Sequence, residues 1–111
     1  MVRRHGEGFG LELTAELHLH ILRPGTRRKS RLQVLIGIPQ PDGENWYCPI
    51  RLKGLDSKEQ RIFGVDSWQA LILALRYVEI RLQHEVRNGA NLFWLEKKIS
   101  VGGLFATRVR P

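Results

Sequence analysis

Two histidines near the N-terminus have the spacing of metal ligands on a strand. His18 and His20 alternate with apolar residues, and Glu16 lies on the same side of the alternation. Histidines two apart on a strand point the same way, and a carboxylate as third ligand would suit zinc. Such a site needs ligands from elsewhere, but the other histidines, His5 and His84, are distant in sequence. We therefore interpret His18 and His20 as part of a solvated strand face, and we expect no metal and no cofactor.

Cys48 is the only cysteine, so no internal disulfide can form. A catalytic thiolate needs a polar, positively charged and partly exposed site. Cys48 instead alternates with Trp46, Ile50 and Leu52, which predicts a small buried apolar side chain. The sequence also contains no serine hydrolase elbow, Walker motif, HExxH motif or CxxC pair. We therefore predict no catalytic residues and expect a protein that is not an enzyme.

A predicted hairpin tip is the most basic part of the chain. Its cations are Arg23, Arg27, Arg28, Lys29 and Arg31. Cations on a protruding turn could bind phosphates, although no aromatic residue for base stacking lies beside them in the sequence. The formal net charge of +7 also favours acidic partners such as nucleic acid. Two interpretations stay open for this tip, a nucleic-acid contact and a solvated surface that keeps the protein soluble.

Strands are predicted on both sides of that tip. Residues 11–21 alternate strictly between apolar and polar side chains, which predicts a long, half-buried strand. Further strands are predicted over 31–38, 46–53 and 60–65, and weaker ones over 92–95 and 104–109. Leu35 should face outward, and Pro49 indicates an edge strand or a bulge because proline cannot donate to a ladder. Turns rich in proline and glycine connect these strands, as in an antiparallel meander.

A long helix is predicted over residues 66–88. Asp66 is a suitable N-cap with Gln69 three residues later, as in a capping box, and Gly89 marks the end. At about 100° per residue, one apolar stripe should pack against the sheet. The stripe consists of Trp68, Leu71, Ile72, Leu75, Val78, Leu82 and Val86.

Three apolar residues of the helix lie nearly opposite that stripe. Leu73, Tyr77 and Ile80 occupy positions where a helix on one sheet should carry charge. Either the C-terminal strands or the N-terminal arm cover them, or they contact another protein or a second copy of the chain. A third interpretation is that they are scattered surface residues without a role. Arg76 and Arg81 lie near Tyr77, and both residue types are enriched at interface centres. We expect these five residues to form a partner-binding surface.

The composition is that of an ordinary globular domain. With 111 residues, 42% hydrophobic and 26% charged, we expect one domain over 1–111, with 1–9 as a flexible arm. The predicted class is α+β, an antiparallel β-meander of four to six strands with one long helix packed on one face. No signal peptide and no apolar run long enough to span a membrane are visible, so we expect a cytoplasmic protein without membrane contact.

Three segments follow one another in a recognisable order. A strand with a Cys-Pro step precedes a Gly-x-Asp-x-x-Gln-Ala-Leu helix, and a short segment ending in Trp-Leu follows. The positions are Cys48, Pro49, Gly64, Asp66, Gln69, Ala70, Leu71, Trp94 and Leu95. This order resembles a family of small bacterial proteins of unknown function, over the central and C-terminal two-thirds of the chain. The resemblance implies a small antiparallel sheet with one long helix, and no activity or ligand. The first hairpin here is more basic and the C-terminal tail longer than in that family.

Two functions follow from these observations. The first is a non-enzymatic protein-interaction module of the accessory, inhibitor or immunity type, which binds a protein partner or itself as a homodimer. The alternative is a nucleic-acid-binding accessory protein that uses the basic first hairpin.

Overall fold

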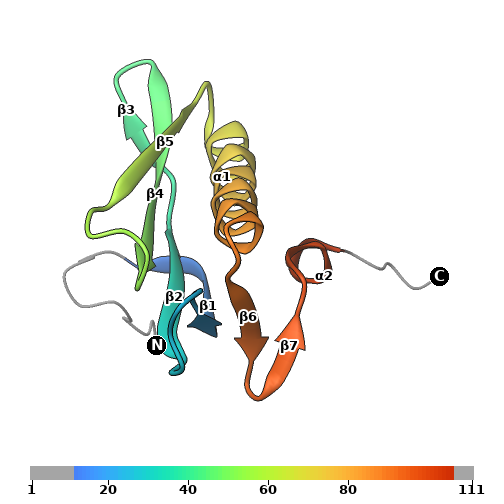
Figure 1. The fold of residues 1–111 in the computed structure, drawn as a ribbon. Helices are drawn as coiled ribbons and strands as arrows, with labels where there is room; N and C mark the ends of the chain where they lie inside the picture. Colours follow the sequence, from blue (N-terminus) through green and yellow to red (C-terminus); the bar gives the residue numbers. More distant parts are fainter. Residues whose placement is uncertain (1–11, 107–111) are drawn as a thin grey trace.

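The computed structural model describes residues 12–106, which form seven strands and two helices (Figure 1). The elements are β1 (Leu13–Leu22), β2 (Ser30–Gly37), β3 (Gln40–Asp42), β4 (Asn45–Lys53), β5 (Gln60–Gly64), α1 (Ser67–Arg87), β6 (Asn91–Trp94), β7 (Lys97–Ile99) and α2 (Val101–Phe105). Every strand pair in this part of the chain is antiparallel. The predicted α+β class, an antiparallel sheet with one long helix on it, is confirmed, although the sheet has seven strands where four to six were predicted.

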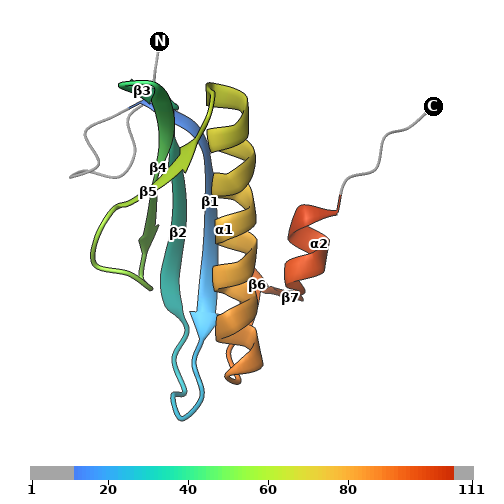
Figure 2. The same ribbon diagram turned by 90° about the horizontal axis from the view of Figure 1, so that it is seen from above.

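The sheet curls around α1 (Figure 1). Its strand order is β3-β4-β2-β1-β6-β7, and β5 pairs with the other edge of β4. The two ends of the sheet therefore lie on opposite sides of α1, and the short helix α2 lies beside α1 on the β6–β7 side (Figures 1 and 2). The turn between β1 and β2 extends past the C-terminal end of α1 (Figure 2).

Pro49 lies in the interior of the sheet, so the prediction of an edge strand is wrong. On one side, β4 pairs with β3 through residues 45–47 and with β2 through residues 50–53. The ladder on that side is interrupted at Cys48 and Pro49, where the chain passes from β2 to β3. A residue without a backbone N–H is tolerated at such an interruption.

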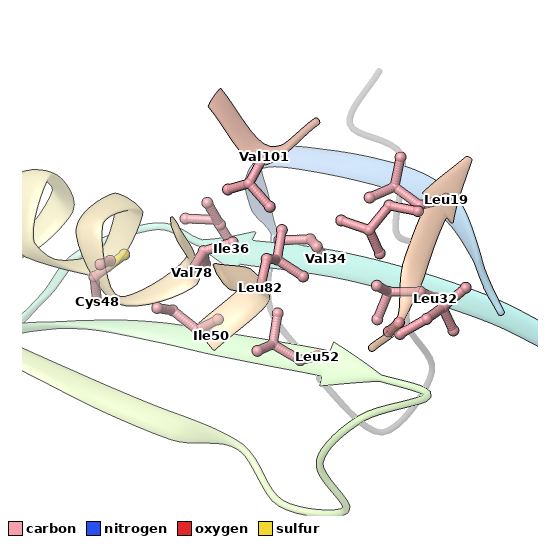
Figure 3. Close-up of a cluster of buried hydrophobic side chains, with 14 of the residues drawn as sticks. Leu19, Leu32, Val34, Ile36, Cys48, Ile50, Leu52, Val78, Leu82 and Val101 are labelled. Carbon is pink, nitrogen blue, oxygen red and sulfur yellow. The ribbon is translucent and has the colours of Figure 1, made fainter. Parts of the chain in front are cut away.

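The core lies between the inner face of the sheet and α1 (Figure 3). From the sheet it contains Leu19, Ile21, Leu32, Val34, Ile36, Cys48, Ile50, Leu52 and Leu92, and from the helices Ala70, Ala74, Val78, Leu82 and Val101. The helical stripe predicted to face the sheet is therefore only partly correct. Val78 and Leu82 are buried, but Trp68 and Ile72 are exposed.

Small residues decide which side of α1 faces the sheet. A Cβ atom at Gly64 would lie 2.5 Å from the backbone nitrogen of Ala70, so the last residue of β5 touches the first turns of the helix. Ala70 and Ala74 are fully buried on this side. Larger side chains would push the helix away from the sheet, so Trp68 and Ile72 are turned outward.

The N-cap predicted at the start of α1 is present, and the return bond of Gln69 goes to Val65, one residue before the cap. The Gln69 N–H donates to Asp66 Oδ1 at 2.7 Å, and the Val65 N–H donates to Gln69 Oε1 at 2.8 Å. Two N–H groups with no partner inside the helix are thereby satisfied. At the other end Gly89 has a φ of 100°, the left-handed conformation that ends many helices.

Two local predictions are wrong. Leu35, expected to face solvent, is buried on the outer face of the sheet, where its register neighbours are the long side chains of Glu16 and Arg51. The strand predicted over 104–109 is instead the helix α2 at residues 104 and 105, and residues 107–109 lie outside the described part. The Ser100 side chain caps this helix by accepting from an N–H at 3.0 Å.

Replacing Gly64 with alanine tests the close approach of α1. The new methyl group would meet helix backbone that cannot move without shifting α1, so we expect the free energy of unfolding to fall by about 2 kcal/mol. Urea denaturation measures the change. Gly102→Ala is the matched control because a Cβ atom there meets nothing within 4 Å. Equal stability of the Gly64 variant and the wild type would contradict the packing described.

Candidate functional site

The five predicted partner-binding residues of α1 differ in accessibility. Ile80 is 61% exposed and Leu73 37% exposed, and Arg76 is also exposed. Tyr77 is only half-buried and packs against the core. The side of α1 predicted to bind a partner is thus partly covered by the protein itself, and three of the five side chains remain well accessible.

Arg81 is held by two carboxylates of the chain. Its Nη1 donates to Glu85 Oε2 at 2.7 Å and its Nη2 donates to Asp56 Oδ1 at 2.9 Å. The bond to Glu85, followed by the bond and charge of Asp56, raises the pKa of Arg81 above its ordinary value, against the opposing effect of burial. Because Asp56 lies between β4 and β5, Arg81 ties this loop to the helix.

The other flank of α1 carries an apolar surface that the sequence did not predict. Trp68 is 72% exposed, Ile72 44% and Leu75 39%. All three belong to the stripe expected in the core. The pair of alanines at positions 70 and 74, one turn apart, could have revealed this surface. Alanines let a helix pack closely, so the side of α1 that carries them faces the sheet in place of Trp68 and Ile72.

Hollows lie beside α2, next to this apolar surface. A groove of about 340 Å³ separates α2 from α1 and the sheet, and residues of all three line it. Its apolar lining includes Leu17, Val34, Ile36, Leu75, Leu104 and Phe105. A second hollow of about 240 Å³ is lined by Ile72, Leu75, Arg76, Glu79 and Phe105. Leu75 lines both hollows and Ile72 lines the second, and Trp68 lies one helical turn before Ile72. We call these three side chains and the two hollows the α1–α2 surface.

The basic hairpin is tied to its surroundings at two points. Arg23 Nη2 donates to the Gly54 carbonyl at 2.6 Å. Lys29 Nζ lies 3.8 Å from the centre of the Phe93 ring, a cation–π contact. The fold thus places an aromatic ring beside these cations, which the sequence alone did not indicate. Arg27, Arg28 and Arg31 are exposed.

His18 interacts with residues on the same face of the sheet. Its Nε2 lies 3.5 Å from Glu16 Oε1, and its Nδ1 lies 3.2 Å from Gln33 Nε2. His84 is distant and lies beside Asn88 on α1. Within residues 12–106, no group of three or more His, Cys, Asp and Glu side chains could hold a metal ion. His5 and the predicted arm over residues 1–9 lie outside the described part.

Cys48 is buried in the core beside Gly37. Its Sγ donates to the Gly37 carbonyl at 3.5 Å, and no part of the residue is exposed to solvent. Burial raises the pKa of the thiol from an ordinary value of 9.0 to about 11. The thiol is therefore protonated at neutral pH, which is unsuited to nucleophilic attack.

Comparison with known proteins gives one family. A family model described as a domain of unknown function (DUF6968) matches residues 16–104, about four-fifths of the chain. The match runs from β1 to α2 and so includes both sides of the sheet and the whole of α1. Neither the curated proteins nor the solved structures contain a match. No helix within residues 12–106 is long and apolar enough to cross a membrane.

The two arginines predicted to bind a partner should differ in their effect on stability. Arg81→Gln removes two ion pairs that are about three-quarters buried, so we expect the free energy of unfolding to fall by about 1 kcal/mol. Arg76→Gln changes an exposed side chain on the same helix and should stay within about 0.5 kcal/mol of the wild type. Urea denaturation of both variants measures this. Equal losses would show that Arg81 does not hold the loop.

Cys48 should be unreactive in the folded protein. We expect an aromatic disulfide reagent at pH 8 to label it only after denaturation. The pKa of the Cys48 thiol is higher in the folded protein than in the unfolded chain. Its contribution to the free energy of unfolding is therefore complete below pH 9, and about 2 kcal/mol is lost as the pH rises towards 11. Cys48→Ala should lack this component of the pH dependence. Rapid labelling of the native protein would contradict the burial of the thiol.

Proposed function

The chain belongs to the DUF6968 family, and from its structure we propose that it is a non-enzymatic protein-interaction module. The proposed binding region is the outer side of α1, and the partner that this region fits is a second copy of the chain. The observation that carries the proposal is the 72% exposure of Trp68 at the start of an apolar flank of α1 that continues with Ile72 and Leu75.

The α1–α2 surface has the composition of an interface centre. Exposed apolar residues scattered singly are ordinary, whereas contiguous ones beside a groove are typical of binding sites. Trp68 and Ile72 lie one turn apart on α1, and Leu75 follows along the same flank. Tryptophan is among the residue types that contribute most to binding energy. An apolar flank of a rigid helix also needs little ordering when it binds.

Charges on the same surface favour self-association. Arg76 and Glu79 both line the hollow beside Phe105, so the surface carries one charge of each sign. In a twofold arrangement the same surface contacts itself, and antiparallel α1 helices can bring Arg76 of one copy to Glu79 of the other. The overall charge of +7 opposes association of two copies, but it is screened beyond about 10 Å at 0.1 M salt.

The residues on the other flank of α1 extend this region. Leu73 and Ile80 remain exposed beside Arg76, and they enlarge the apolar area that a second helix could cover. Tyr77 and Arg81 contribute mainly through the fold, since Tyr77 packs on the core and Arg81 binds Asp56. We propose Leu73, Arg76 and Ile80 as partner contacts, with Tyr77 and Arg81 positioning the helix.

We also infer the organism type, the compartment and the class of protein. The Cys-Pro step and the Gly-x-Asp-x-x-Gln-Ala-Leu segment have physical roles in the fold, which supports their use as marks of the family. Pro49 lies at an interruption of the ladder, Gly64 admits the helix, and Asp66 and Gln69 cap it. On the resemblance carried by these segments, we propose a bacterial, cytoplasmic protein of the accessory, inhibitor or immunity type.

Charge placed on the α1–α2 surface should dissociate the dimer. We expect wild-type protein to sediment as a dimer at micromolar concentrations. The double variant Trp68→Glu with Ile72→Glu should raise the dimer Kd at least tenfold, because two carboxylates would have to be buried. Analytical ultracentrifugation over a concentration series measures the Kd, and circular dichroism checks that the variant is folded.

The matched control is Leu95→Asp, which also places a charge on an apolar side chain that is 72% exposed. Leu95 lies between β6 and β7 with a φ of 56°, a conformation that aspartate tolerates well. This variant should leave the Kd unchanged. A monomeric wild-type protein at every concentration, or equal dissociation by the control, would contradict the proposal.

A further inference from the structure

Basic and aromatic residues gather on the outer face of the sheet, the face turned away from α1. Opposite residues of an antiparallel pair lie on the same face. His20 pairs with Arg31 on one side and with Phe93 on the other, and Phe93 pairs with Lys98. These four side chains form one row across β2, β1, β6 and β7. They point outward because their chain neighbours, such as Ile21 and Leu92, are buried in the core.

A second row runs beside the first. His18 pairs with Gln33, and Gln33 pairs with Lys53, so these residues continue the same face across β1, β2 and β4. Neither row contains an aspartate or a glutamate. Glu16 lies in the next row and contacts His18 at 3.5 Å. We call the seven residues of the two rows, together with Lys29, the outer-face cluster.

Lys29 adds a fourth cation to the cluster, above the Phe93 ring. Its Nζ lies 3.8 Å from the centre of the half-buried Phe93 ring, which places the ammonium group where a planar group would stack. Lysine has a flexible four-carbon stem, and Lys29 is exposed. A base stacked on Phe93 would displace the ammonium group towards the neighbouring phosphate. The Phe93 ring and the Lys29 ammonium group would then contact the base and the phosphate of one nucleotide.

We propose that the outer-face cluster binds single-stranded nucleic acid without sequence specificity. Lys29, Arg31, Lys53 and Lys98 would bind phosphates, and Phe93 would stack on a base. A single strand fits better than a duplex because only an unpaired base offers its flat face to a ring. The four strands of the first row span about 14 Å, because neighbouring strands lie about 4.8 Å apart. This width accommodates a short run of nucleotides. The cluster lies on the opposite side of the sheet from α1, so the proposal does not depend on dimerisation.

Binding is tested with a fluorescein-labelled twelve-nucleotide oligothymidylate and with oligouridylate of the same length. Fluorescence anisotropy gives the Kd between 50 and 300 mM salt. We expect a Kd in the micromolar range at the lowest salt for at least one strand type. Neutralising four phosphates should give a slope of log K against log salt of about −3, at about 0.7 per phosphate. A binding constant that does not vary with salt would overturn the proposal.

Two variants separate charge from stacking. Arg31→Glu with Lys98→Glu should weaken binding at least tenfold and roughly halve the slope. Phe93→Leu keeps an apolar side chain in β6 and should weaken binding of the single strand about threefold to tenfold. It should leave the affinity for heparin, a polyanion without bases, unchanged. If Phe93→Leu does not fold, a comparison of wild-type binding to single-stranded and double-stranded DNA tests stacking instead.

The matched control is Lys58→Glu with Arg87→Glu, which changes the net charge equally through exposed residues outside the cluster. This control should retain wild-type affinity within about twofold. Equal losses in the control and in the Arg31 and Lys98 variant would overturn the proposal, because binding would then depend on overall charge alone. Equal affinity of the wild type for duplex and single-stranded DNA would also overturn it.

Discussion

The close contact between the end of β5 and the first turns of α1 determines most of the structure. Gly64 leaves no room for a side chain against the Ala70 backbone, and Ala70 and Ala74 follow with the smallest side chains that a helix favours. The helix therefore lies close to the sheet at this end. Because the small residues take the buried side, the large ones, above all Trp68 and Ile72, are left on the outside.

The same arrangement gives the protein two chemically different outer surfaces, one on α1 and one on the sheet. The buried residues between the inner face of the sheet and α1 are all apolar, and Cys48 is one of them, with a pKa raised to about 11 by burial. The outer side of α1 is apolar with single charges such as Arg76. The outer face of the sheet is basic, with the Phe93 ring beneath Lys29. A protein contact and a polyanion contact could thus be made by one small domain without overlap.

Much of the fold follows from local patterns in the chain. The alternation over residues 11–21 predicts β1, and Asp66 with Gln69 predicts the start of α1, because both depend on neighbours only a few residues away. The rotation of α1 was predicted incorrectly because helical periodicity places the stripe by hydrophobicity and ignores side-chain volume. The contact of Lys29 with Phe93 joins residues far apart in the chain, so it depends on the β1–β6 pairing, which no local pattern reveals.

The orientation of α1, in which small residues face the sheet and Trp68 lies outside, can be measured directly. Hydroxyl-radical footprinting of dilute, monomeric protein, read by mass spectrometry, reports the accessibility of each tryptophan. We predict that Trp68 is oxidised at least as fast as Trp94, which is 54% exposed, and several times faster than the half-buried Trp46. Oxidation of Trp68 as slow as that of Trp46 would show that the helix is turned the other way.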